Sequence, residues 1–292
     1  MKIVHSYWSK PYFNVESDKG GWYHNMFHYM SCALSCLTFS KYYDVELVTD
    51  KAGKELFVDK MNLPYSSVRV VLDDLDNYPP YLWAIGKLYT YSIQTEPFIH
   101  VDNDIYVWDK FDEDFVESSI VAHNLEMAYP MNKEFFFDIM QKFSYIPQQL
   151  IETFNEFNDV VEINAGVFGG SDLKFFNEYS TEAFKFVDAN INQIINLKRP
   201  GMFNIIYEQF LFYALATRAN KEIKYLIDRQ IDENFLGVTD FWETPKKTKY
   251  IHAVGMYKSW YIIGEQMAQR LWFEYPKYYE LIVDLYKKRQ IQ

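Results

Sequence analysis

The first third of the chain alternates short apolar runs with longer amphipathic segments. Short apolar runs predict β-strands, and apolar residues that recur every three or four positions predict helices. The predicted strands span residues 3–7, 45–49, 68–72, 97–101 and 105–108, and the predicted helices span residues 22–40, 51–61 and 82–95. This alternation predicts an α/β fold, with a mainly parallel central sheet flanked by helices and ligands bound at the carboxyl ends of the strands.

The second half of the chain follows a less regular pattern. Strands are predicted at residues 120–124, 160–168 and 250–253, and helices within residues 132–158, 173–195, 207–219 and 263–288, the last interrupted near Pro276. No repeat, low-complexity segment or linker divides the sequence. We therefore expect one continuous domain over residues 1–292.

The composition narrows the classes of function. The chain is 49% hydrophobic and 24% charged, which allows a sizeable core. Its formal net charge of −11 argues against a nucleic-acid polymer as partner, because phosphate backbones are bound by basic surfaces. Trp, Tyr and Phe number 7, 25 and 24, whereas glycine numbers only 11, and neither common glycine-rich phosphate loop is present.

Residues 20–40 contain no Asp, Glu, Lys or Arg, as a membrane span would. His, Asn, Ser and Thr side chains interrupt this stretch, so a buried amphipathic helix is the better interpretation. Cys32 and Cys36 are the only cysteines, too few for a disulfide framework. Since the N-terminus also lacks the pattern of a secretory signal, we expect a cytoplasmic protein.

Three Asp-x-Asp patterns occur, and their contexts separate them. Asp112/Asp114 lies in a polar loop and is typical of a solvated cluster, while Asp74/Asp76 leads into a turn before two prolines. Asp102/Asp104 has an apolar strand on each side. Two buried carboxylates oppose each other's ionisation unless a cation joins them, and oxygen ligands suit Mn²⁺ or Mg²⁺. The alternative is a pair of turn-forming aspartates at a strand end.

The sequence around Asp102/Asp104 resembles the Asp-x-Asp segment of GT-A glycosyltransferases, and is closest to the retaining family that includes glycogenin and lipopolysaccharide galactosyltransferases. Three further features follow that family's order. Lys87 resembles its basic residue before the motif, residues 164–168 (Asn-Ala-Gly-Val-Phe) resemble its Asn-Ala-Gly strand, and residues 251–260 resemble its His-x-x-Gly-x-x-Lys-Pro-Trp motif. The last match departs at Ser259, where proline is usual. The resemblance covers residues 1–262 by motif order.

The resemblance implies a single GT-A domain that transfers a sugar, with retention, from a nucleotide diphosphate sugar such as a UDP-sugar. Residues 1–108 would bind the donor, residues 109–262 would face the acceptor, and residues 263–292 would form a C-terminal helical segment. The acceptor would be a hydroxyl group of a carbohydrate, glycolipid or protein. His252 would join Asp102 and Asp104 as a ligand of Mn²⁺ or Mg²⁺.

Other residues are expected to contact the donor. Gly255 would let the backbone approach the phosphates, and Lys258 would supply charge to them. The remaining candidates are Asn164, Glu208 and Gln209 at the sugar, Lys87 at the donor, and Tyr7 and Asp50 at the base and ribose. All of these except Lys87 have a structural alternative: Asn164 a strand entry with a turn, Glu208 and Gln209 an exposed helix face, Tyr7 a core residue and Asp50 a turn.

Three weaker patterns remain. His24, His28 and Cys32 share one helix face, but a buried stripe is favoured over a zinc site because no fourth ligand is suggested. Ser171 is not in a G-x-S-x-G context and is predicted to cap a helix. Residues 278–289 place aromatic rings beside cations, and are interpreted either as a solvated helix end or as a peripheral contact with the inner face of an anionic membrane.

Two other functions stay open. A sugar-phosphate nucleotidyltransferase shares the sheet and the metal chemistry, but it would need a glycine-rich basic loop after the first strand, where residues 8–13 read Trp-Ser-Lys-Pro-Tyr-Phe. A non-catalytic nucleotide- or carbohydrate-binding protein could retain the same fold.

Overall fold

The computed structural model describes residues 1–14, 20–126, 129–228 and 239–291. The chain divides into two compact units. We call Lys2–Asp76, Val101–Phe111 and Phe235–Gln292 the outer unit, because both terminal segments except Met1 belong to it. Met1, Asn77–His100 and Asp112–Asn234 form the middle unit. The expected single domain over residues 1–292, with its internal boundaries, stays a prediction.

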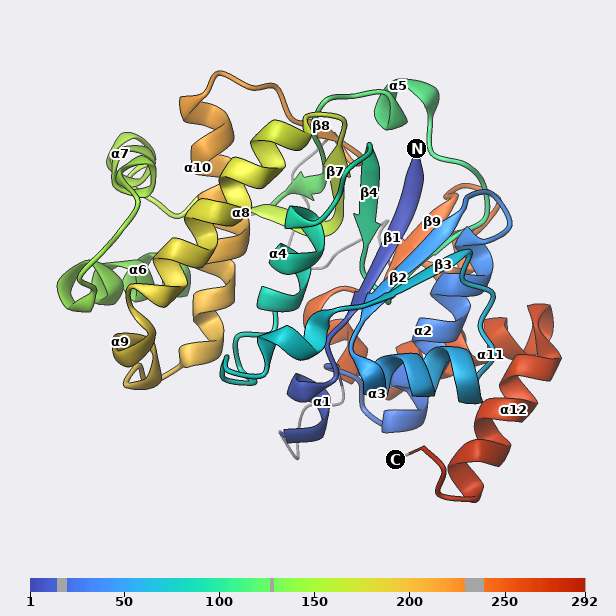
Figure 1. Ribbon diagram of the computed structural model, residues 1–292. Helices are drawn as coiled ribbons and strands as arrows, with labels where there is room; N and C mark the ends of the chain where they lie inside the picture. The colour runs from blue at the N-terminus through green and yellow to red at the C-terminus, as the bar shows by residue number, and fades with distance from the viewer. Residues whose placement is uncertain (15–19, 127–128, 229–238, 292) are drawn as a thin grey trace. The chain divides into compact units, whose positions relative to one another are not determined.

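The described strands form a main sheet of seven, in the order β3-β2-β1-β4-β7-β6-β8, and a second sheet of two, β5-β9. β1 pairs in parallel with β2, β2 with β3, and β6 with β8, whereas β6 and β7 are antiparallel. The predicted α/β fold with a mainly parallel sheet flanked by helices is confirmed (Figure 1).

The outer unit builds its core from β1 and β2 and from the helices that cover them. α2 is buried along nearly its whole length, and α11 and α12 pack against it (Figure 1). The strands of this unit are β1 (Lys2–Tyr7), β2 (Val45–Thr49), β3 (Ser67–Val70), β5 (Ile105–Val107) and β9 (Tyr250–His252), and the helices are α1 (Lys10–Asn14), α2 (Asn25–Phe39), α3 (Lys51–Lys54), α11 (Tyr261–Glu274) and α12 (Pro276–Lys287). Shorter helical turns occupy Glu55–Lys60, Leu72–Leu75, Phe241–Glu243 and Gly255–Ser259.

The middle unit packs α8 against α4 and α10, and α10 also packs against α7. Its strands are β4 (Phe98–Val101, whose last residue belongs to the outer unit), β6 (Val121–Leu125), β7 (Ile163–Gly170) and β8 (Lys224–Tyr225). Its helices are α4 (Ile85–Ser92), α5 (Glu113–Val116), α6 (Pro130–Lys142), α7 (Gln148–Phe157), α8 (Leu173–Asp188), α9 (Ile191–Ile195) and α10 (Leu211–Arg218), with shorter turns at Pro200–Met202 and Ile205–Phe210.

Element ends differ from the predictions for local reasons. α2 begins at Asn25 rather than near residue 22, because the His24 side chain accepts the Met26 amide and caps the helix. α8 is capped by Asp172, which accepts the Phe175 amide, so the prediction that Ser171 caps it is wrong. The predicted interruption near Pro276 is confirmed, since Pro276 is the first residue of α12.

Among the described residues, no helix is both long enough and apolar enough to cross a bilayer.

Candidate metal and diphosphate site

The two aspartates of the central motif lie in the turn that joins β4 to β5. Asn103, between them, donates its side-chain amide to the Ser6 carbonyl at the end of β1 (2.9 Å). The Asn103 carbonyl accepts from the Ser31 hydroxyl of α2 (2.8 Å), and the Ile105 amide closes the turn on the Asp102 carbonyl (3.1 Å). A strand end and a buried helix therefore hold the turn in place.

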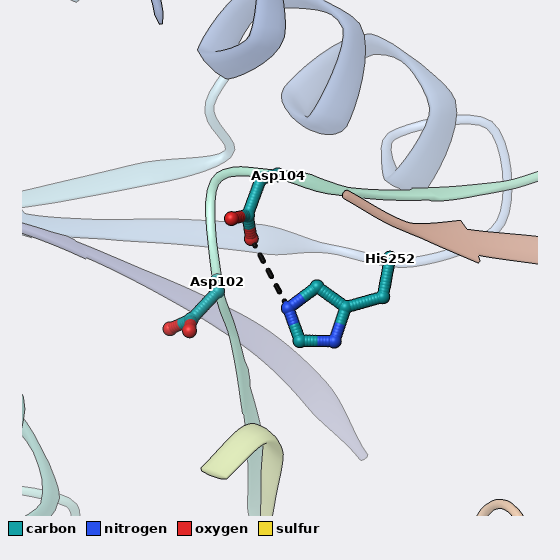
Figure 2. Close-up of side chains that lie close together, drawn as sticks. All are labelled: Asp102, Asp104 and His252. Atoms are coloured by element: carbon teal, nitrogen blue, oxygen red, sulfur yellow. Dashed lines mark ion pairs between the residues drawn. The ribbon is translucent and has the colours of Figure 1, made fainter. Parts of the chain in front are cut away.

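His252, the last residue of β9, lies beside this turn although it is far from it in the sequence. β9 runs antiparallel to β5, with His252 opposite Ile105, and the Ala253 amide donates to the Asp104 carbonyl (2.9 Å). This register places His252 beside Asp104 (Figure 2). One potential ligand atom from each of Asp102, Asp104 and His252 lies within 4.8 Å of the others.

Lys258 and His252 both face the Asp104 carboxylate. Lys258 Nζ donates to Asp104 Oδ2 at 2.6 Å, and His252 Nε2 lies 3.5 Å from Oδ1. Asp104 is only 6% exposed, and this burial by itself would raise the pKa of its carboxyl group. The interactions with Lys258 and His252 together outweigh burial, so the pKa of Asp104 is held well below its ordinary value. Asp104 is therefore a permanent anion at neutral pH.

The donor set fits a divalent cation. Two carboxylates and an imidazole suit Mn²⁺ or Mg²⁺, and the low pKa of Asp104 keeps one carboxylate ionised for binding. The structure thus brings together Asp102, Asp104 and His252, and adds Lys258 to them. Their role as metal ligands stays a prediction.

Two glycines shape the backbone next to Lys258. Gly255 adopts a left-handed conformation with φ of 54° at the start of the helical turn that carries Lys258. Gly21 also has a positive φ, of 80°, and a Cβ atom there would lie 3.3 Å from Lys258 Cε. A Cβ atom at Gly255 would have no neighbour within 4 Å, which agrees with the expectation that the backbone there can be approached. Its contact with phosphate stays a prediction.

The two residues expected at the base and ribose have partners within the outer unit. Asp50 accepts the Gly53 amide (2.8 Å) and the Ser9 amide (2.7 Å), which caps α3 and leaves each oxygen with a backbone donor. Tyr7 is 2% exposed and stacks on Tyr12, with ring centroids 4.8 Å apart. These contacts favour the structural alternatives for both residues, while their binding roles stay predictions.

Four further candidates belong to the middle unit. Glu208 lies in a π-helical segment, is fully buried, and forms an ion pair with Lys87 (3.2 Å). The idea that Glu208 lies on an exposed helix face is therefore wrong, whereas Gln209 is half-buried. Asn164 lies in β7, and its side-chain amide donates to Glu126 Oε1 (2.6 Å). Its side-chain oxygen Oδ1 accepts the Gly166 backbone amide (2.9 Å). The π-helical segment that carries Glu208 and Gln209 is of a kind that often occurs at functional sites.

A carboxylate cluster beside Asn164 escaped the sequence analysis. Glu162 is 3% exposed, and its backbone carbonyl accepts the Glu126 amide (2.9 Å). Burial, followed by the charge of Glu126, raises the pKa of Glu162 to about 8, although a hydrogen bond from Asn132 opposes this. The only sequence signal was a glutamate two residues before the Asn-Ala-Gly motif, inside a stretch predicted to be a strand.

The competing patterns lie in ordinary surroundings. Asp114 forms an exposed ion pair with Lys224 (2.6 Å), as expected of a solvated cluster. His24 caps α2, while His28 and Cys32 are buried with His28 Nε2 3.9 Å from Cys32 Sγ. Burial, followed by the charge of Lys258, lowers the pKa of His28 to about 3. These positions agree with a buried helix stripe.

Comparison with known proteins gives similar solved structures and a matching family. The crystal structure of mouse xyloside xylosyltransferase 1 in its apo form is similar with a TM-score of 0.43 and 12% identity, covering 86% of this chain and 96% of that chain. No curated protein matches this sequence. A family model described as a family of unknown function (DUF6734) matches residues 1–285, so the chain belongs to that family.

Proposed function

We propose that this protein is a metal-dependent glycosyltransferase of the GT-A type, which transfers a sugar from a nucleotide diphosphate sugar to a hydroxyl acceptor. The observation that carries the proposal is the convergence of Asp102, Asp104, His252 and Lys258 in one part of the outer unit. Sequence motifs about 150 residues apart were expected to supply this set, and their side chains do lie together. Neither motif alone would support a metal site.

The chemistry follows from what each group can do. A bound Mn²⁺ or Mg²⁺ would supply a Lewis acid that stabilises charge on a nucleoside diphosphate as it leaves. Asp102, Asp104 and His252 would hold the cation, and Lys258 would add a positive charge toward the diphosphate. The family resemblance favours a UDP-sugar, Mn²⁺ and retention of configuration.

The residues proposed to contact the sugar and the donor are Asn164, Glu208, Gln209 and Lys87. Asn164 would present an amide to sugar hydroxyls, and Gln209 would lie near the carbon under attack. Glu208 would act through Lys87, because its fully buried carboxylate and that ammonium form an ion pair. This assignment makes Glu208 a positioning residue rather than a nucleophile. We retain residues 1–108 as the proposed donor half and residues 109–262 as the acceptor half.

The proposal is tested by slow hydrolysis of a panel of nucleotide sugars with Mn²⁺, which needs no knowledge of the acceptor. We expect one donor to release its nucleoside diphosphate, and the double variant Asp102→Asn/Asp104→Asn to lose this release. The matched control is Asp112→Asn/Asp114→Asn, which changes an Asp-x-Asp pattern at an exposed position and should keep the wild-type rate.

Other outcomes separate the alternatives. Binding of a nucleotide sugar with the same affinity with and without Mn²⁺, and no hydrolysis, would favour a non-catalytic binding protein. Release of pyrophosphate from a nucleoside triphosphate and a sugar phosphate would favour a nucleotidyltransferase.

A further inference from the structure

Lys258 binds the carboxylate of Asp104, which is one of the three proposed metal ligands. Its ammonium lies 2.6 Å from Asp104 Oδ2, while Oδ1 of the same carboxylate faces His252 Nε2 at 3.5 Å. Oδ2 therefore lies against an ammonium group, whereas Oδ1 faces the imidazole and has no hydrogen-bond partner among the described residues. A divalent cation and an ammonium group repel each other strongly at contact distance, particularly at a carboxylate that is only 6% exposed.

The same lysine is the one expected to contact the diphosphate. An ammonium group is a compact point charge, so its attraction to Asp104 weakens as it moves toward a phosphate oxygen. The diphosphate would thus offer Lys258 a new partner when a metal takes the Asp104 oxygen.

The surroundings of Lys258 allow this change without moving the backbone. The Lys258 carbonyl accepts the Tyr23 amide at 3.1 Å, and the residue lies inside the helical turn Gly255–Ser259, so its main chain is anchored. Its side chain is 20% exposed and passes beside Gly21, which has no side chain to obstruct it. Rotation of the four-carbon stem would therefore move the ammonium group away from Asp104 without moving the backbone.

We propose that Lys258 exchanges partners: it pairs with Asp104 in the absence of nucleotide, and it moves to the diphosphate when metal and nucleotide bind together. This inference rests on the proposed function and adds a regulatory property to it. In the absence of nucleotide, Lys258 competes with the metal. With nucleotide present the competition is relieved, so metal and diphosphate each strengthen the binding of the other.

The exchange has a use for an enzyme of this class. A site that binds metal weakly by itself, but tightly together with the diphosphate, assembles only around a donor or a product. Lys258 also neutralises Asp104 in the empty protein, where a buried lone carboxylate would be costly.

The test measures Mn²⁺ binding by electron paramagnetic resonance, which reports free Mn²⁺ without any need for turnover. Wild type, Lys258→Met and Lys258→Gln are titrated with Mn²⁺ alone and with Mn²⁺ in the presence of UDP. Lys277→Met is the matched control, because Lys277 is an exposed lysine of α12. Thermal unfolding verifies that each variant is folded, and Lys258→Gln replaces Lys258→Met if the latter is not.

We expect Lys258→Met to bind Mn²⁺ more tightly than wild type without UDP, by about 5- to 150-fold, the range of ordinary coupling between sites. The same variant should bind UDP more weakly and lose most of the UDP-dependent gain in Mn²⁺ affinity. These opposite changes would not result from a purely structural role of the lysine.

Equal or weaker Mn²⁺ binding by folded Lys258→Met without UDP would overturn the exchange and leave the proposed function standing. A wild-type Mn²⁺ affinity in Asp102→Asn/Asp104→Asn would instead overturn the proposed metal site, and the exchange with it.

Discussion

The buried carboxyl group of Glu162 predicts an unusual pH dependence of stability. The perturbation is Glu162→Gln, which replaces the acid by an amide of the same shape that cannot ionise. Its Oε1 atom can still accept from the Asn132 side chain, as the Glu162 carboxyl does at 2.7 Å. The variant therefore removes the proton equilibrium and preserves the hydrogen bond.

The magnitude follows from proton linkage. The pKa of Glu162 is about 8 in the folded chain, against an ordinary value of 4.5, first because of burial and then because of Glu126. Between these values the folded state binds more protons than the unfolded state, so the free energy of unfolding falls as pH rises. Where the folded state binds one full proton more than the unfolded state, the free energy of unfolding falls by about 1.4 kcal/mol per pH unit. The expected fall between about pH 6 and pH 8.5 is therefore about 2.5 kcal/mol.

The assay is urea unfolding, followed by circular dichroism, over this pH range, which stays above the sequence pI of about 5.1. The stability of Glu162→Gln relative to wild type should rise by about 2.5 kcal/mol from the acidic to the basic end. Glu178→Gln, an exposed change on α8, is the control and should give a flat difference. A flat difference for Glu162→Gln as well would refute the claim that Glu162 is neutral in the folded protein.

Three further predictions concern stability and the site. Lys87→Met should destabilise the chain by about 3–5 kcal/mol in urea unfolding, because it leaves the Glu208 carboxylate buried without its ion pair, and Glu208→Gln in the same chain should restore part of the loss. Gly255→Ala should lower the free energy of unfolding by about 1–2 kcal/mol, since alanine is strained at a φ of 54°. A change in melting temperature that matches Gly201→Ala, a control at a half-buried glycine without a positive φ, would contradict this. Asn103→Ala should lower the free energy of unfolding by about 1 kcal/mol and weaken Mn²⁺ binding, because the turn loses its hydrogen bond to the Ser6 carbonyl. An unchanged Mn²⁺ affinity would show that this hydrogen bond does not position the aspartates.

The sequence predicted the parallel part of the fold well, because buried parallel strands appear as short apolar runs. β2 has the predicted ends, Val45 and Thr49, and β1 differs by one residue. Helix ends were harder, since they depend on side chains such as His24 and Asp172 that accept backbone amides. The π-helical turns at Glu55–Lys60 and Ile205–Phe210 leave no clear trace in hydrophobic spacing.

The site was predictable only in part. The apolar strands on either side singled out Asp102 and Asp104, the family resemblance added His252, and the pairing of β5 with β9 is what brings His252 to them. The placement of Lys258 on Asp104 was not foreseen, because which of several partners a lysine takes depends on three-dimensional reach rather than on spacing. Glu162 was missed for a related reason: burial raises its pKa, and a single sequence does not show how deeply a glutamate lies.

The central claim is that Asp102 and Asp104 bind a nucleoside diphosphate through a metal ion. Isothermal titration of UDP into the wild-type chain, with Mn²⁺ and with chelator, tests it most directly. We predict binding that requires Mn²⁺ and disappears in Asp102→Ala/Asp104→Ala, while Asp112→Ala/Asp114→Ala binds as wild type does. Mn²⁺-dependent binding of UDP that survives in Asp102→Ala/Asp104→Ala would contradict the account.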